Sequence, residues 1–400
     1  MQRKESYFYR VFKPLIMLYK IRGRLLFIFS AVCLAFQFSH AQNSTKLKYA
    51  PSLYAGIEVG SKGVKLSIVD IAKSAKTNSA FTIVKDTSVN TDFISFTDPS
   101  SEATLNGLYN LYQFATEQYK IPSANIYTVV SSGVKVQAEK DAKLNFINNL
   151  VEAFRNKIND QKRKVDVIDA LQEARLSHLG IVPDNKRYTT FLVDIGSGNT
   201  KGGFFPNGNT KDFKLFTLTW GTKSVANAAE KRLDESDKTL ANYGRQLQRV
   251  LSTAENSEII YAVNSSGAYL LSDNIAFSGG IAWSVATLTH PELYDRPVVP
   301  VTFDEIKELN EKLYTNFNQF SPDILLRKLS SNDPQRDAVQ KEVKRVLQVF
   351  DQKALMAGTG LLVKMMRQFS SIYETKQFYL VKNGQVGWIS AYVDQTLINK

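Results

Sequence analysis

The stretches YAGIEVGSKGVKLSIV, residues 54–69, and FLVDIGSGNTKGGF, residues 191–204, follow one plan and decide the fold. Each begins as an apolar strand that ends in an acid, turns at Gly-Ser, and continues into a second strand-like run. Because glycine permits a tight turn, each stretch predicts a β-hairpin. The repeated hairpin predicts two similar domains, each beginning with one copy.

Helical and strand patterns fill the segments around the hairpins. Apolar residues at three- and four-residue spacing predict helices, and short apolar runs predict strands. The predicted helices cover about 105–115, 144–158, 170–179, 303–314 and 339–369; the predicted strands cover 126–130 and 165–168, with a final pair at 378–381 and 387–392 turned at Asn383-Gly384. This order predicts an α/β protein with two related lobes, and the cleft between them is the expected ligand site.

Composition limits the chemistry that this protein can use. The chain has 400 residues, of which 44% are hydrophobic and 22% charged, so it is globular rather than fibrous or disordered. A single cysteine excludes a disulfide scaffold and a four-cysteine zinc site. With only three histidines, we expect any catalysis to depend on carboxylates, hydroxyls and backbone amides.

The first 41 residues have the pattern of a secretory signal peptide. Seven basic residues and one acid lie in 1–24, an uncharged apolar stretch covers 25–38, and small residues precede a cut after Ala41. The alternative is an uncleaved membrane anchor, but 14 residues of helix rise ~21 Å and the hydrocarbon core is ~30 Å thick. Cleavage would lower the formal net charge from +12 to +6. We expect a periplasmic or secreted protein whose mature chain is not embedded in a membrane.

The two Gly-Ser turns have the chemistry of phosphate-binding loops. Their backbone N–H groups can point at an anion, and their hydroxyls can add hydrogen-bond donors. The preceding carboxylates, Glu58 and Asp194, could hold a hydrated Mg²⁺. A single loop of this kind often has no ligand, so the prediction depends on the pair. Neither Gly-x4-Gly-Lys-Ser/Thr nor Gly-x-Gly-x-x-Gly after a strand is present.

In their order, these motifs resemble the Ppx/GppA phosphatases of the actin/Hsp70/sugar-kinase superfamily, which are exopolyphosphatases and guanosine pentaphosphate phosphohydrolases. GIEVGSKGVKL (56–66) is similar to the family pattern xIDIGSNSxRL, and VSSGVKVQA (130–138) to ATSAxRxA. VIDALQEARLSHLGI (167–181) is similar to xISGxEEARLxxLGV, and DIGSGNTK (194–201) to DIGGGSTE. Weaker similarities continue to NGQVGW (383–388), so the resemblance covers almost all of the chain after the predicted signal peptide.

The resemblance implies a fold and a set of site residues. The fold would be two ribonuclease-H-like lobes, at 50–187 and 188–400, with an interlobe cleft. Glu58 and Asp194 would bridge Mg²⁺, and Glu173 would direct the attacking water. The implied phosphate-binding residues are Gly60, Ser61, Lys62, Lys65, Lys135, Gly196, Ser197, Gly198, Asn199 and Thr200.

This chain departs from the family pattern at several of these positions. Glu58 replaces an aspartate, and Gln172 replaces the acid next to the catalytic glutamate. Lys65 and Lys135 replace arginines. Each position therefore has an ammonium, which acts as a point charge, in place of a guanidinium that can bind a phosphate through two N–H groups. His178 is expected to lie on a helix face rather than to act as an acid or base.

Three functions are therefore open. The first is an exported, Mg²⁺-dependent phosphohydrolase that cleaves terminal phosphoanhydride bonds of polyphosphate or nucleoside polyphosphates. The second is another enzyme of the superfamily, an apyrase-like nucleotidase or a kinase, although a kinase would lack ATP outside the cytoplasm. The third is a catalytically inactive phosphate- or nucleotide-binding member of the fold. No nucleic-acid-binding motif is present, and the oligomeric state stays open, a homodimer included.

Overall fold

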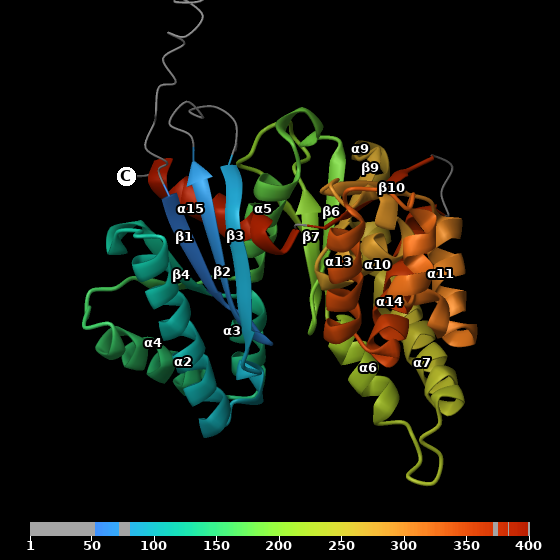
Figure 1. Cartoon of the computed structure of the whole chain (residues 1–400), viewed down its shortest axis with the longest axis horizontal. Coiled ribbons are helices and arrows are strands. Elements are labelled where there is room, and N and C mark those ends of the chain that lie inside the picture. Colours follow the sequence, from blue (N-terminus) through green and yellow to red (C-terminus); the bar gives the residue numbers. More distant parts are fainter. Residues whose placement is uncertain (1–52, 72–80, 371–374, 383, 399–400) are drawn as a thin grey trace, which may run out of the picture. The chain divides into compact units, whose positions relative to one another are not determined.

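Two β-sheets organise the part of the chain that the computed structural model describes, residues 53–71, 81–370, 375–382 and 384–398 (Figure 1). All of these residues fall in one contact unit, Ser52–Lys400. The predicted signal peptide, residues 1–41, lies outside the described residues. Within them, no helix has both the length and the apolar character needed to cross a bilayer.

The first sheet is built on the first predicted hairpin. Its strand order is β3-β2-β1-β4-β5, in which β1, β2 and β3 are antiparallel and β4 and β5 continue parallel to β1. The strands are β1 (Leu53–Val59), β2 (Gly63–Ile71), β3 (Phe81–Asn90), β4 (Ile126–Val130) and β5 (Val165–Val167). Ile57 and Val59 of β1 are fully buried, as expected of a central strand with helices on its face.

The first half has three helices before β5: α2 (Asp98–Gln113) comes after β3, and α3 (Ser132–Lys140) and α4 (Leu144–Lys157) come after β4. Thr97 caps α2 by accepting a hydrogen bond from the backbone N–H of Ser100, and a proline occupies the first turn. The helices bury apolar residues such as Leu108 and Phe154 in the same core as the strands. The predicted helices over 105–115 and 144–158 correspond to α2 and α4, whereas α3 was not predicted as a separate helix.

The second sheet repeats the topology of the first and adds one strand. Its order is β10-β11-β9-β6-β7-β8, with β6-β7-β8 antiparallel and β9 and β11 parallel to β6. The strands are β6 (Thr190–Ile195), β7 (Thr200–Phe204), β8 (Lys214–Leu218), β9 (Asn274–Ser278), β10 (Val298–Val301) and β11 (Gln377–Val381). Apart from β10, which pairs antiparallel with β11 at the edge, the five positions correspond to those of the first sheet.

Most of the remaining helices pack in the core of this second sheet. They are α6 (Thr222–Glu230), α7 (Leu240–Ala254), α8 (Ile260–Ser265), α9 (Ala268–Leu271), α10 (Gly280–Thr289), α11 (Phe303–Thr315), α12 (Pro322–Leu325), α13 (Arg336–Val349) and α14 (Gln352–Ser370). The predicted helix over 339–369 is thus two helices, because Phe350 adopts an extended conformation between α13 and α14.

Helices α5 (Ala170–Ile181) and α15 (Gly384–Ile398) connect the two halves. Helix α5 packs against β7 of the second sheet, whereas α15 packs against β1 of the first, and the two helices pack against each other (Figure 1). Their backbones approach so closely that a Cβ on Gly180 would lie 2.0 Å from the carbonyl oxygen of Gly387. Glycine is required at this crossing, since any side chain would force the helices apart.

The prediction of a final strand pair is wrong. Residues 377–381 do form a strand, but the expected second strand, 387–392, lies within helix α15. The helix is buried around most of its circumference: Trp388, Ile389, Tyr392 and Val393 are all at most 7% exposed. A helix that is apolar on nearly every side loses the 3.6-residue pattern, so that a short apolar run cannot be told from a strand.

Candidate functional site

The two predicted hairpins form, and they turn in the same way. The N–H of Gly60 donates to the carbonyl of Gly63 at 2.9 Å, and that of Gly196 donates to the carbonyl of Asn199 at 3.0 Å. In each hairpin the acid next to the last residue of the first strand lies opposite a lysine seven residues later. Glu58 is the cross-strand partner of Lys65, and Asp194 is the cross-strand partner of Lys201.

These residues and Glu173 form a carboxylate–lysine cluster, consisting of Glu58, Lys65, Glu173, Asp194 and Lys201. The Lys65 ammonium lies 3.6 Å from Glu58 Oε2. The Lys201 ammonium lies 2.7 Å from Glu173 Oε1 and 3.8 Å from Asp194 Oδ2. Lys201 therefore joins a carboxylate of the first half to one of the second. Its side chain is only 7% exposed, whereas that of Lys65 is 35% exposed.

Helix α5 holds Glu173 in a fixed position. The Asp169 carboxylate caps this helix by accepting the N–H of Gln172 at 2.7 Å, which places Glu173 in the first turn. The second oxygen of Glu173, Oε2, accepts a 2.7 Å hydrogen bond from the backbone N–H of Ser132 at the start of α3. Because a helix N-terminus is electropositive, this contact favours the ionised carboxylate.

The charges in the cluster stabilise one another. Burial by itself would raise the pKa of Glu173, but the Lys201 ammonium and the hydrogen bonds from Lys201 and Ser132 outweigh it, and the pKa lies below its usual value. Burial would likewise lower the pKa of Lys201, yet Glu173 and Asp194 raise it overall. At neutral pH the buried pair is therefore a carboxylate and an ammonium.

Glu58 and Asp194 have further partners that the sequence analysis missed. The Trp388 indole N–H, from α15, donates to Glu58 Oε2 at 3.2 Å, and the Ser278 hydroxyl, from the end of β9, donates to Asp194 Oδ1 at 2.8 Å. Burial raises the pKa of Glu58, and the Lys65 ammonium only partly offsets this effect. Trp388 lies in the NGQVGW motif. The motif drew attention to this residue but did not indicate that it would contact Glu58.

The tips of the two loops meet the N-terminus of α3. A Cβ built on Gly133, in the first turn of α3, would lie 3.3 Å from Ser61 Oγ and 3.8 Å from Asn199 Oδ1. Ser61 belongs to the first loop and Asn199 to the second, so the predicted loops and the SSG segment do converge. Hydroxyl, amide and helix N-terminal groups gathered in this way are suited to an anion.

Lysines line the surface beside these loops. Lys62, at the tip of the first loop, and Lys223, in the first turn of α6, each place an ammonium 3.4 Å from Asp92 Oδ1. Helix α6 is held there because the Ser197 carbonyl of the second loop accepts the N–H groups of Lys223 and Ser224. Lys62 was predicted to bind phosphate; Lys223 was not singled out, because it lies outside both loop motifs.

Two of the predicted phosphate-binding residues have partners of their own within the protein. Lys135 pairs with Glu139 along its own helix at 4.0 Å. Thr200 is fully buried, and its hydroxyl donates to the Trp220 carbonyl at 2.7 Å. This hydroxyl proton is therefore not available for a hydrogen bond to a phosphate. His178 is buried on α5, where its ring packs against Phe205 and Phe213 and is hydrogen-bonded to the Thr190 carbonyl, in keeping with a packing role.

The residues predicted to hold Mg²⁺ do not fit that ion as they are arranged. Magnesium demands near-octahedral oxygen ligands at about 2.0–2.1 Å. Within the described ranges, no three Asp, Glu, His or Cys side chains form a group that could hold a metal. The oxygens of Glu58, Glu173 and Asp194 instead face the ammonium groups of Lys65 and Lys201. A metal would have to displace an ammonium, so we derive no step through one.

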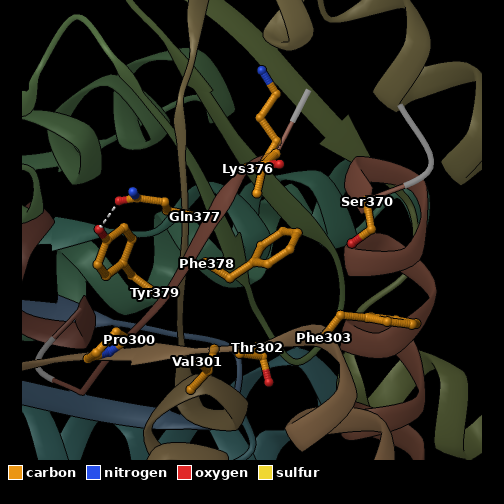
Figure 2. A pocket seen from close by; sticks show the side chains of 10 residues that line it. Pro300, Val301, Thr302, Phe303, Ser370, Lys376, Gln377, Phe378 and Tyr379 are labelled. Atoms are coloured by element: carbon orange, nitrogen blue, oxygen red, sulfur yellow. Dashed lines mark hydrogen bonds between the residues drawn. The ribbon is translucent and has the colours of Figure 1, made fainter. Parts of the chain in front are cut away.

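The cavity shown in Figure 2 lies at a different place in the fold. It has a volume of about 540 Å³ and lies along β10 and β11, with Pro300, Phe303, Gln377 and Tyr379 among its lining residues. The Tyr379 hydroxyl donates to Gln377 Oε1 at 2.6 Å. None of the predicted site residues lines this cavity. The candidate site is therefore the carboxylate–lysine cluster with its adjoining loops.

Comparison with known proteins identifies the fold. No protein-family model and no curated protein matches the sequence. Solved structures do match. A Ppx/GppA family member from Aquifex aeolicus superposes with a TM-score of 0.56 at 16% identity, covering 87% of this chain and 98% of its own. An exopolyphosphatase from Cytophaga hutchinsonii superposes with a TM-score of 0.52 at 12% identity, covering 86% of this chain and 98% of its own.

A second Aquifex aeolicus structure, the type II variant of the Ppx/GppA phosphatase, gives a TM-score of 0.53 at 17% identity over 85% of this chain and 99% of that one. Identities this low establish the fold and not the activity. The motif order had pointed to the same family, so the resemblance is confirmed at the level of structure. The chain has the two-sheet α/β fold of the Ppx/GppA phosphatases.

Proposed function

We propose that this protein is a phosphohydrolase that cleaves terminal phosphoanhydride bonds of polyphosphate or nucleoside polyphosphates. The observation that carries the proposal is Glu173, a buried and ionised carboxylate held by Ser132 and Lys201 beside two glycine loops. A carboxylate held next to an anion-binding surface is placed where it could direct water at a bound phosphate. The fold shared with exopolyphosphatases supports the choice of substrate class.

The loops and lysines would bind the phosphate chain. Backbone N–H groups of the two Gly-Ser loops, with Ser61 and Asn199 at their tips, would hold the terminal phosphate. Lys62 and Lys223 would meet the phosphates further along the chain, because both lie beside the loops and share one carboxylate, Asp92, among the described residues. Positioning and charge stabilisation of this kind supply most of the rate in phosphoryl transfer.

Glu173 would orient a water molecule in line with the terminal phosphorus. The water oxygen forms the new P–O bond, the bond to the bridging oxygen breaks, and inorganic phosphate leaves beside a chain shortened by one unit. With its pKa lowered, Glu173 would act mainly by positioning the water and would take up its proton late. Magnesium, which the resemblance implies, is given no ligands in this scheme.

A second candidate function is phosphate or nucleotide binding without turnover. It is favoured by the 2.7 Å contact between Lys201 and Glu173, since a carboxylate paired this closely is a weak base. An apyrase-like nucleotidase would share the loops but would prefer ATP to polyphosphate. Which substrate is cleaved, if any, therefore distinguishes the phosphohydrolase, the binding protein and the nucleotidase.

The experiment measures phosphate release from the purified chain, residues 42–400, with polyphosphate, tripolyphosphate, ATP and guanosine pentaphosphate, each with and without Mg²⁺. The Glu173→Gln variant sets the background, and Glu152→Gln, which alters an exposed acid of α4, is the matched control. Release from polyphosphate or tripolyphosphate above the Glu173→Gln background supports the hydrolase. Binding of these anions without release would support the second function instead.

We also propose that the protein is exported. The support is the basic, apolar and small-residue pattern of residues 1–41, together with the lack of cysteine after Cys33. N-terminal sequencing of the protein recovered from the periplasm or medium should begin at Gln42. A chain that starts at Met1 and stays with the membrane fraction would show an anchor in place of a cleaved signal.

A further inference from the structure

Lys201 occupies the place between carboxylates at which this kind of site would be expected to hold a cation. Its ammonium contacts Glu173 of α5 at 2.7 Å and Asp194 of β6 at 3.8 Å, so it bridges acids that come from the two halves of the fold. The side chain is 7% exposed, and Glu173 and Asp194 are 4% and 16% exposed. A divalent cation placed between the same oxygens would collide with this ammonium.

Most of the negative charge of the cluster is offset without a metal. The three carboxylates of the cluster meet two ammonium groups, and each lysine lies opposite an acid in its own hairpin. An ammonium has three N–H donors, and the close contact to Glu173 uses one of them. The others can turn to a phosphate oxygen. The similar motif DIGGGSTE ends in an acid at the position of Lys201, so this residue reverses the charge at a single point of the loop.

We propose that the Lys201 ammonium takes the place of a divalent cation between Glu173 and Asp194, so that the protein binds and cleaves phosphoanhydride chains without a bound metal. For cleavage, this inference rests on the proposed function. The ammonium carries one positive charge and not two; Lys65 in the cluster and the loop-side lysines Lys62 and Lys223 supply the rest.

The first test compares chelated and Mg²⁺-containing conditions. Phosphate release from sodium tripolyphosphate in EDTA should stay within about threefold of the rate with Mg²⁺, whereas a site that depends on bound metal would lose about a hundredfold or more. Calorimetric titration of the wild-type protein with MgCl₂ alone should show no site-specific heat. A larger fall in rate than threefold, or a stoichiometric Mg²⁺ site in the protein alone, overturns the inference.

The second test reverses the charge. Lys201→Glu places three carboxylates together, and we expect this variant to bind Mg²⁺, to release phosphate slowly in EDTA and to recover when Mg²⁺ is added. Lys201→Met has similar length and no charge, and Mg²⁺ should not restore its rate. If the Lys201→Glu chain needs metal to fold, its melting temperature should rise with Mg²⁺ while that of Lys201→Met does not. Identical responses of the two variants would contradict the role assigned to the ammonium.

Binding separates this inference from the proposed function. If no substrate is cleaved under any condition, the hydrolase proposal fails. Calorimetric binding of tripolyphosphate to the wild-type protein in EDTA then decides the inference. Binding that is retained in EDTA and weakened in Lys201→Met supports it, and binding that appears only with Mg²⁺ overturns it.

Discussion

The two glycine hairpins share a backbone plan but differ in what their lysines meet. Both turn through the same N–H to carbonyl bond, and both set an acid opposite a lysine seven residues on. In the first hairpin, Lys65 pairs with Glu58, the only carboxylate of the described residues within 4.0 Å of its ammonium, and it is 35% exposed. In the second, Lys201 contacts both Asp194 and Glu173 and is 7% exposed. The difference comes from α5, which delivers Glu173 to only one of the two lysines.

The comparison separates what the repeated hairpin does from what its surroundings do. A cross-strand acid–lysine pair is an ordinary way to stabilise two strands, and Lys65 needs no further explanation. In the second hairpin a third charge, that of Glu173, is buried with the pair. Lys201 is therefore the centre of an ion-pair network that is costly to disturb. Glu58 finds its additional partner in the neutral indole of Trp388 instead. We therefore place the chemistry at the second hairpin and treat the first as a binding surface.

The largest effect is expected from Glu173→Gln. The amide keeps the size and the hydrogen bond from Ser132 but loses the charge that positions water, so the rate of phosphate release should fall about 10²- to 10⁴-fold, or ~3–5 kcal/mol. Binding of tripolyphosphate, measured by calorimetry, should change little, because a carboxylate does not attract a polyanion. The Glu152→Gln control should keep the full rate. Full turnover in Glu173→Gln would make Glu173 a structural acid and remove the distinction between the hairpins.

The next effect compares the two lysines directly. Lys201→Met leaves Glu173 buried without its cation, and the free energy of unfolding should fall by about 3 kcal/mol, as for other buried pairs that lose one partner. Lys65→Met removes a pair of which only the lysine is partly exposed, and the Trp388 indole still donates to the buried Glu58 carboxylate, so we expect a smaller loss of about 1 kcal/mol. Urea unfolding of the two variants measures both values. Equal losses would show that the hairpins are equivalent and that α5 adds nothing to the second.

The sequence predicted the backbone of this site better than its contacts. Strand alternation and Gly-Ser turns are local, so both hairpins, their acids and the helix that holds Glu173 could be predicted. The pairing of Lys201 with Asp194 could also have been predicted, because the turn of a hairpin determines which residues of its two strands lie opposite each other. Its contact with Glu173 was not, since that depends on how α5 packs against β7.

Long-range packing also explains the other misses. Trp388 reaches Glu58 across 330 residues of sequence, and it does so from a helix that the pattern presented as a strand. The N–H of Ser132 reaches Glu173 across 41 residues. Thr200 stands in a loop motif, yet its hydroxyl turns inward to Trp220. In each case the residue type was visible in the sequence, and its direction depended on elements that are distant in the chain.

Helix α5 also contains a group that should make stability depend on pH. Burial lowers the pKa of His178 from 6.5 to about 4. The unfolded chain therefore binds more protons between these values, so stability is full above pH 6.5 and falls as the pH drops toward 4, by roughly 3 kcal/mol in all. Urea unfolding at several pH values measures the slope. His178→Gln keeps a donor for the Thr190 carbonyl and should flatten this part of the profile; an unchanged profile would mean that His178 is not responsible.

The smallest effect is expected beside the loop tips, where Asp92 restrains one lysine from each half. Its Oδ1 atom lies 3.4 Å from the ammonium groups of both Lys62 and Lys223, and all three side chains are at least 36% exposed. Exposed pairs of this kind contribute little to stability. Asp92→Asn should therefore leave the melting temperature nearly unchanged.

The same substitution frees two positive charges for a polyanion. We expect Asp92→Asn to tighten tripolyphosphate binding by about two- to threefold at low ionic strength, and the gain should disappear near 1 M salt, where the Debye length is about 3 Å. Asp337→Asn, which alters an exposed acid on α13, controls for the change in net charge. Calorimetry at two salt concentrations measures the difference. A gain of equal size in Asp337→Asn would mean that net charge, and not the position of Lys62 and Lys223, sets the affinity, and these two lysines would then have no specific part in binding.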